Sequence, residues 1–233
     1  MFPETRWTLV LAAGQASHPE GQRALESLCE AYWYPVYGYI RNCGHSADDA
    51  RDLTQEFFLD LLDGAFLQRV DRDRGRFRTF LLGAVKFFLS DHHRRHRARK
   101  RGGGTETVPF EISSGETTLQ REPTHLETPE RIFERRWANA VLNRALQHLR
   151  QEFAAHGRAE YFEEVKVYLA GHCELPYADM ARRLNLSESA VKAGIHRLRK
   201  RYRETLRAEV ASMVSEAEDV EAEIRYLAAT LNT

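Results

Sequence analysis

The side chains best suited to chemistry in this 233-residue chain lie between Asp91 and Arg101. His92 and His96 are spaced at i and i+4, which places two imidazoles on one helix face, where they could share a metal ion. The glutamate of an HExxH motif is missing, and neighbouring arginines repel a cation. We therefore expect no functional metal site, and a nuclease or other metal enzyme would have to show metal-dependent turnover.

The same stretch is rich in cations. From Phe77 the sequence is first apolar, and after Asp91 it contains only basic charges: Arg94, Arg95, Arg97, Arg99, Lys100 and Arg101. This pattern favours a helix that leaves a core and lies along phosphates, with a solvated basic helix end as the alternative. Phe87 and Phe88 precede the cations, so an exposed ring at either position would stack on an unpaired base. Core packing is the alternative for each ring.

A second nucleic-acid signal spans residues 175–206. Pro176 begins a short helix, Asn185 suits a left-handed turn position, and Ser187 caps a second helix. The second helix carries candidate base-contacting and phosphate-contacting side chains: Ser187, Glu188, Ser189, Lys192, His196, Arg197, Arg199, Lys200, Arg201 and Arg203. This order is typical of a DNA-binding helix-turn-helix, and a nonbinding hairpin with a basic face is the alternative.

An acidic helix face is the third candidate site. Ser46, followed three residues later by Asp49, predicts a helix start, and the helix continues to Leu62. Its polar edge contains four side chains: Asp49, Asp52, Gln55 and Glu56. Such an edge suits a basic helical partner, although three surface acids are commonly just a solvated face.

These segments require a scaffold, and apolar spacings of three and four predict one that is almost entirely helical. Residues 107–112 are the single weak strand candidate. The block from Arg6 to Cys43 is expected to form at least two helices, interrupted at Pro19 and near Pro35, because an interior proline removes a backbone hydrogen bond.

The domain organisation follows from a change in composition. Residues 102–129 contain four glycines, three prolines and many Ser, Thr and Glu, so they cannot bury enough surface to form a core. We expect an all-α protein with a helical domain (1–101, including an N-terminal helical extension), a flexible linker (102–129), a helix-turn-helix domain (130–213) and an acidic amphipathic helix (214–233).

The last helix has two expected sides. Its acidic side comprises Glu216, Glu218, Asp219, Glu221 and Glu223, and its apolar side comprises Val220, Ile224, Leu227, Ala228 and Leu231. A capping helix is the favoured role. Docking on a basic DNA-binding face, or binding a regulator, is the alternative.

Composition excludes several protein classes. Lys+Arg and Asp+Glu number 34 each, so global charge predicts no electrostatic partner. No apolar run approaches the roughly 18 residues of a membrane span, and residues 1–6 lack the basic start of a signal peptide, so we expect a cytoplasmic protein without a membrane partner. Three cysteines without a CxxC pair argue against a disulfide framework and a zinc ribbon.

Catalytic motifs are also missing. The sequence has no glycine-rich phosphate loop, no GxSxG elbow and no cysteine–histidine pair in a catalytic context. We therefore expect a binding protein with no catalytic residue and no cofactor.

The acidic, basic and helix-turn-helix segments together resemble bacterial RNA polymerase sigma factors of the extracytoplasmic-function group in the sigma-70 family. The region 2 motif DA.DL.QE.F is similar to Asp49, Ala50, Asp52, Leu53, Gln55, Glu56 and Phe58. The following region 2 stretch resembles Phe77, Phe80, Leu81, Asp91, Arg94 and Arg95. Region 4 resembles Tyr177, Ala181, Leu184, Leu186, Ser187, Val191, Lys192, His196, Arg197 and Arg199.

This resemblance implies partners and roles. Core RNA polymerase would bind through its beta-prime clamp, and also its beta flap, with the clamp contacting Asp49, Asp52, Gln55 and Glu56. The minus-ten element would be contacted and opened by Phe80, Lys86, Phe87, Asp91, Arg94, Arg95, Arg97 and Arg99. The minus-thirty-five element would be contacted by Ser187, Glu188, Ser189, Lys192, His196, Arg197, Arg199 and Lys200.

The expected function is thus that of a promoter-specificity factor, with an anti-sigma factor or another regulator as a further possible partner. The alternative is a stand-alone helix-turn-helix regulator, which would need a dimer and symmetric half-sites but no polymerase.

Overall fold

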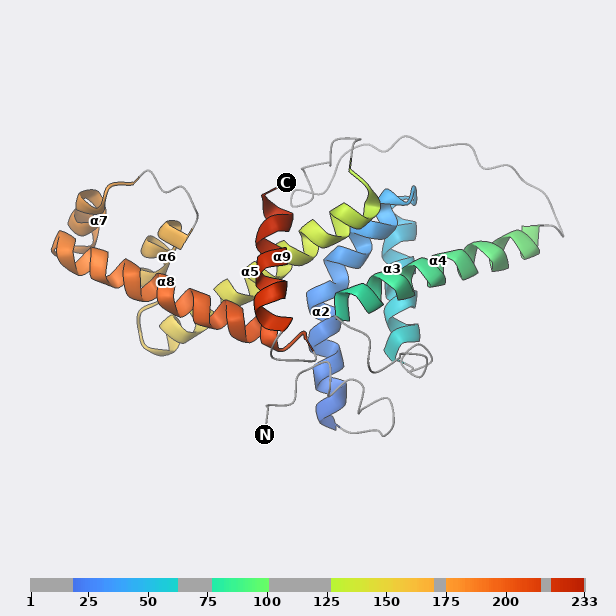
Figure 1. Cartoon of the computed structure of the whole chain (residues 1–233), viewed down its shortest axis with the longest axis horizontal. Coiled ribbons are helices and arrows are strands. Elements are labelled where there is room, and N and C mark those ends of the chain that lie inside the picture. The colour runs from blue at the N-terminus through green and yellow to red at the C-terminus, as the bar shows by residue number, and fades with distance from the viewer. Residues whose placement is uncertain (1–18, 63–76, 101–126, 170–174, 215–218, 233) are drawn as a thin grey trace. The chain divides into compact units, whose positions relative to one another are not determined.

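The computed structural model describes residues 19–62, 77–100, 127–169, 175–214 and 219–232, and every regular element in these ranges is a helix (Figure 1). The expected all-α fold is confirmed. The weak strand candidate at 107–112 lies outside the described residues. The chain divides into two compact units: described residues up to Trp137 form the first unit, and those from Ala138 form the second.

The first unit contains α2 (Pro19–Asn42), α3 (Ala47–Leu62), α4 (Phe77–Lys100) and the start of α5 (Pro129–Ala155). The predicted start of α3 is confirmed, because the Asp49 backbone N–H donates to Ser46 Oγ at 3.1 Å and the Ser46 hydroxyl donates to the Asp49 carboxylate at 2.7 Å. This local cap fixes where the acidic helix begins.

The expected helix break near Pro35 is wrong. Helix α2 continues through Pro35 to Asn42 as one element. The residues on both sides of the proline are buried, including Tyr32, Val36 and Ile40. Packing of these side chains therefore offsets the lost backbone hydrogen bond. Helix α2 begins at Pro19, at a position that needs no intrahelical N–H donor, and the helix expected before it lies outside the described residues.

Aromatic rings form much of the core of the first unit. Tyr32 of α2 meets Phe77 of α4 edge-on at 5.0 Å, and Phe57 of α3 meets Phe88 of α4 at 5.6 Å between ring centroids. Trp33 stacks on Phe58 at 5.6 Å. Three helices that each carry one apolar stripe are thereby joined into one bundle.

The start of α5 completes this core. Thr128 caps the helix, with its Oγ1 accepting from the Arg131 N–H at 3.3 Å. Ile132, Phe133 and Trp137 are each 1% exposed. The sequence placed residues from 130 onward in the second domain, whereas the structure assigns residues up to Trp137 to the first unit. Periodicity identifies the buried face of a helix but not the partner that covers it.

A buried arginine links α4 to the start of α5. Arg78 lies over the ring of Trp137, with its Cζ 5.1 Å from the ring centroid, and its Nη1 is 3.3 Å from Glu134 Oε1. The Arg136 side chain lies against Gly38 of α2, where a Cβ atom would collide with it. Gly38 therefore leaves room for the Arg136 side chain beside α2.

The second unit comprises α5 from Ala138, α6 (Ala159–Val165), the short 3-10 helix η2 (Lys166–Leu169), α7 (Tyr177–Leu184), α8 (Glu188–Ala211) and α9 (Asp219–Leu231). Its main core combines side chains from all but the last of these helices: Leu149, Phe162, Val165, Tyr168, Met180, Ala181, Val191, Ile195 and Leu198. Gly194 of α8 permits close contact with the Tyr161 hydroxyl of α6.

The turn between α7 and α8 has the local geometry expected for Asn185 and Ser187. Asn185 adopts the left-handed conformation (φ 52°, ψ 46°), and the Leu186 N–H donates to Ala181 O at 2.9 Å. Ser187 is the N-cap of α8, and its Oγ accepts from the Ala190 N–H at 3.2 Å. The turn between α7 and α8 is thus fixed by two side chains with strong local preferences.

Helix α9 packs on the C-terminal half of α8. Figure 1 shows α7 at one end of α8 and α9 near the other. Val220 and Leu227 of α9 are buried, and Glu221 pairs with Arg207. The expectation that Glu223 lies on an outer acidic side is wrong, because this side chain is 2% exposed. This contact favours the capping role.

Candidate protein and nucleic-acid interfaces

Helix α3 exposes the acidic face expected from the sequence. The stripe Ala50, Leu53, Phe57 and Leu61 is buried, which turns the opposite side toward solvent. Asp52 and Gln55 are exposed and Glu56 is half-buried. In the described part of the chain, neither Asp52 nor Glu56 makes an ion pair. Both carboxylates are therefore available to a basic partner, whereas Asp49 is engaged by the Ser46 cap.

The sequence analysis missed one apolar residue on this face. Leu59 is 55% exposed and lies one to two helical turns after Gln55 and Asp52. Leu59 lies seven residues after Asp52, so helical spacing in the sequence already places the two side chains on the same face. An exposed leucine among carboxylates gives the face an apolar contact point, and such mixed surfaces are typical of protein interfaces.

A histidine cluster adjoins the start of α3. His45 stacks on His93 of α4 at 5.5 Å between ring centroids, and His92 lies 6.4 Å from His93. Burial lowers the pKa of His45, the neighbouring His93 and His92 lower it further, and Asp49 opposes this shift. From α2, Arg41 donates to the His45 carbonyl at 2.6 Å. His45 is thereby favoured in its neutral form.

We expect the first unit to lose stability as pH falls through this histidine's titration range. The folded protein binds the His45 proton less readily than the unfolded chain does, so stability is complete above the usual pKa near 6.5 and declines below it. His45→Gln should reduce the slope of the free energy of unfolding between pH 7 and pH 5. Urea unfolding at several pH values measures this slope. The exposed His156→Gln is the control, and equal slopes in both variants would contradict the assignment.

The structure of α4 distinguishes Phe87 from Phe88, for which the sequence allowed either base stacking or core packing. Phe88 is 1% exposed and belongs to the core, whereas Phe87 is 49% exposed. At 100° per residue, Phe80, Phe87, Asp91 and Arg94 lie on the same side of the helix. Phe80 is half-buried and lies 6.1 Å from Phe77. Phe87 is therefore the described phenylalanine on this helix most accessible to a base.

The cations of α4 are partly paired. Arg94 and Arg95 each contact Asp91 at 2.9 Å, and Lys86 Nζ contacts Glu130 Oε1 at 2.8 Å. The Lys86 ammonium is the main cause of the lowered pKa of Glu130. Lys86 thus forms an ion pair with α5, while Arg94 and Arg95 are exposed to solvent. Helix α4 extends to Lys100, but the side chains of His96, Arg97 and Arg99 lie outside the described residues.

On α8, the candidate DNA-contacting residues fall into two groups. One group has intramolecular partners: the Ser187 and Ser189 hydroxyls are 3.0 Å apart, Lys192 pairs with Glu188 at 2.6 Å, and Arg199 Nε donates to Tyr168 O at 3.1 Å. Arg201, which the sequence also suggested, is held by Glu152 at 2.9 Å.

The other group has no ion pair within the described ranges and is exposed: His196, Arg197, Lys200 and Arg203. His196, Lys200 and Arg203 follow at i, i+4 and i+7 and therefore lie along one face. Ser189 and Ala193 continue this face toward the helix start, and Arg197 lies to one side. The arrangement presents small side chains at the N-terminal end and unpaired cations farther along.

The described residues bear on two expectations from the sequence, which concern a metal site and a membrane span. No group of three or more His, Cys, Asp or Glu in these ranges is arranged to hold a metal ion. His92 and His93 instead contact Phe88 and His45, and the side chain of His96 is not among those described. Within the same ranges, no helix combines the length and the apolar character that crossing a bilayer requires.

Comparison with known proteins gives one match. Residues 28–99 match the family model for Sigma-70 region 2, a span that runs from within α2 to near the end of α4. The matched span includes the acidic face of α3 and the aromatic and basic face of α4. No curated protein and no solved structure matches the chain.

Proposed function

We propose that this protein is a promoter-specificity factor that binds core RNA polymerase and directs it to promoters, as a member of the extracytoplasmic-function group. The observation that carries the proposal is the exposed acidic face of α3, where Asp52 and Glu56 lack ion pairs among the described residues and Leu59 adds an apolar contact. This face lies inside the span that matches Sigma-70 region 2.

In this proposal, the beta-prime clamp of the polymerase covers the α3 face. Basic groups on the clamp pair with Asp52 and Glu56, and Leu59 is removed from water. Gln55 supplies a neutral hydrogen-bonding group between them. Asp49 contributes by fixing the start of the helix through Ser46, so it positions the interface rather than forming its centre.

Helices α4 and α8 contact DNA in this proposal. The helix-turn-helix of α7 and α8 places the start of α8 at base edges of the minus-thirty-five element, while Lys200 and Arg203 contact phosphates. Phe87 stacks on a base of the opened minus-ten element, and Arg94 and Arg95 contact its backbone. The protein performs no chemistry on DNA itself, and the beta flap and an anti-sigma factor are further proposed partners.

The experiment that tests the proposal is co-purification of the full chain with bacterial core RNA polymerase at moderate salt. Retention, followed by promoter-dependent transcription from a genomic fragment library, is the expected result. If the chain is not retained but binds symmetric duplex sites as a dimer, the stand-alone regulator is correct instead. The helix-turn-helix geometry of α7 and α8 is the observation that favours this second candidate.

We expect Phe87→Ala to impair promoter opening without affecting polymerase binding. Loss of one base–aromatic stack costs about 1–3 kcal/mol, so opening should weaken by roughly fivefold to 150-fold. Because the ring is 49% exposed, folding should be nearly unchanged. Permanganate reactivity of unpaired thymines measures opening. Tyr34→Ala removes a ring that is 64% exposed on α2 and serves as the matched control. An unchanged opening equilibrium in Phe87→Ala would exclude this stacking role.

A further inference from the structure

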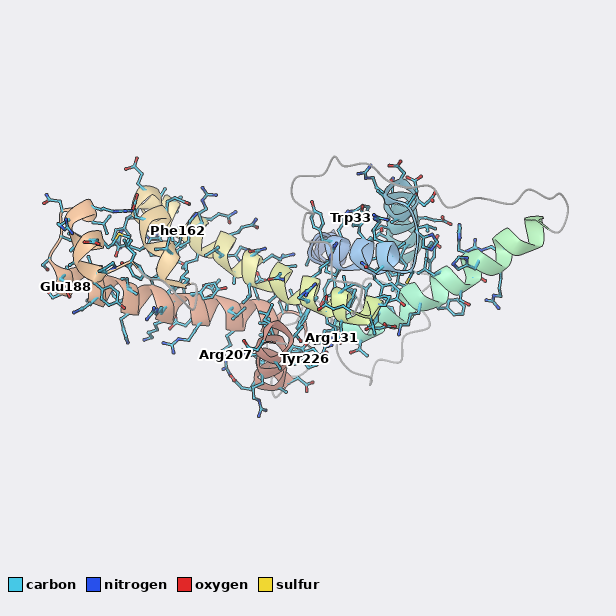
Figure 2. The ribbon with its side chains drawn as sticks, turned by 90° about the horizontal axis from the view of Figure 1, so that it is seen from above. Trp33, Arg131, Phe162, Glu188, Arg207 and Tyr226 are labelled. Atoms are coloured by element: carbon cyan, nitrogen blue, oxygen red, sulfur yellow. The ribbon has the colours of Figure 1, made fainter. Side chains whose placement is uncertain are left out.

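The first turns of α8 contain few side chains that remain able to contact bases. In a helix-turn-helix, the N-terminal residues of the second helix meet base edges in the major groove. Ser187 caps the helix, and its hydroxyl lies 3.0 Å from that of Ser189. Ala190 and Ala193 are exposed but nonpolar. The long polar side chains in this part are the exposed Glu188 and Lys192, and Figure 2 shows Glu188 at the end of α8.

These two exposed side chains pair with each other. Lys192 Nζ is 2.6 Å from Glu188 Oε1, and the ammonium lies 5.7 Å from the centroid of the Tyr177 ring of α7. The Glu188 carboxylate raises the pKa of Lys192, so the lysine is charged in this pair. Contacts from two helices therefore restrict where the ammonium lies before any DNA binds.

The pair differs in charge from Lys200 and Arg203, which lie farther along α8. Lys200 and Arg203 have no ion pair in the described ranges and attract phosphates at any sequence. Glu188 and Lys192 together carry no net charge, so they add little to that sequence-independent attraction. A carboxylate on a DNA-facing surface is repelled by phosphates, and a hydrogen bond accepted from a base offsets this repulsion.

The spacing within the pair matches one edge of a base pair. Guanine O6 and cytosine N4 are joined by a hydrogen bond of about 2.9 Å in a Watson–Crick pair, close to the separation of the two charged atoms. In the major groove, guanine presents two acceptors, O6 and N7, and cytosine presents the N4 donor. Thymine O4 and adenine N6 have the same spacing, so discrimination rests on the neighbouring groups. Thymine offers the lysine one acceptor beside a methyl group, and adenine N7 is an acceptor that repels the carboxylate.

We propose that Glu188 and Lys192 act together as a specificity-determining pair that selects a G·C base pair in the upstream promoter element. Lys192 donates to guanine O6 and N7, and Glu188 accepts from cytosine N4. This inference rests on the proposed function, and it assigns sequence discrimination to these two residues while Lys200 and Arg203 provide affinity.

The test uses the full chain bound to core RNA polymerase and a duplex library randomised across the upstream element. Sequencing of the retained DNA should show guanine enriched about tenfold at one position. The double variant Glu188→Gln with Lys192→Gln preserves the net charge and the approximate shape of the pair. It should lose this preference while other positions and the salt dependence of binding stay unchanged. Lys200→Gln, the control, should weaken all sequences alike and reduce the salt slope by about one phosphate contact.

Other outcomes separate this inference from the proposed function. If the double variant retains the guanine preference, or weakens all sequences equally, the pair does not discriminate bases and the inference is wrong, although the promoter function stands. If the wild-type chain does not bind core polymerase, the proposed function itself fails. Circular dichroism of each variant confirms that the exposed substitutions leave the helices intact.

Discussion

Asp52→Arg should abolish retention of the chain on core RNA polymerase while leaving its fold intact. Asp52 is exposed at the middle of the α3 face and has no ion pair in the described residues, so folding does not depend on its charge. At an interface, the arginine would replace an attraction with like-charge repulsion. Losing one paired charge costs about 2–5 kcal/mol, and reversal adds to that loss. Titration of labelled chain with core polymerase measures the change in Kd.

The matched control is Glu160→Arg, which makes the same charge reversal at an exposed helical position in the second unit. This variant should bind core polymerase like the wild type. Asp52→Asn, which removes the charge without reversing it, should fall between the wild type and Asp52→Arg. Equal binding by the wild type and Asp52→Arg would place the polymerase contact elsewhere.

Trp137→Ala should destabilise the first unit by about 3–5 kcal/mol, the usual cost of truncating a large buried aromatic side chain. Trp137 is 1% exposed, and its ring covers the buried guanidinium of Arg78. Removing the ring leaves a cavity and removes the aromatic face that contacts the buried Arg78 guanidinium. Typical domains have only about 5–15 kcal/mol of stability, so a large part would be lost. Urea unfolding followed by far-ultraviolet circular dichroism measures this difference.

Tyr34→Ala provides the comparison, because its ring is 64% exposed and its loss should cost about 0.5 kcal/mol or less. A fragment that ends at residue 128 should be less stable than one that ends at residue 143, since only the longer fragment contains Ile132, Phe133 and Trp137. A Trp137→Ala cost similar to that of Tyr34→Ala would show that the start of α5 contributes little to the first unit.

The features predicted well from the sequence depend on short-range chemistry. Ser46 and Ser187 cap helices because a hydroxyl reaches an N–H three residues later, and Asn185 tolerates the left-handed backbone. The buried stripe of α3 follows from helical spacing alone. For these features, neighbouring residues determine the outcome, and the sequence contains all the information needed.

The features that the sequence did not predict depend on residues far apart in the chain. Pro35 stays within α2 because the residues around it are buried on both sides. Lys86 pairs with Glu130, and Arg199 donates to Tyr168 O, so each has an intramolecular partner on another helix. Glu223 is buried although its helix is acidic. The polymerase and DNA roles of the candidate residues are still predictions that the binding experiments must test.

The stacking of Trp33 on Phe58 has a practical consequence for optical measurements. The indole lies between α2 and α3, and Phe58 precedes the exposed Leu59 directly, so partner binding on α3 should alter the indole's surroundings (Figure 2). Trp137, in contrast, is fully enclosed beside Arg78 and should emit at shorter wavelength. With Trp7 replaced by phenylalanine, the remaining two indoles would give one intrinsic fluorescence signal for docking and a second for unfolding, without any attached dye.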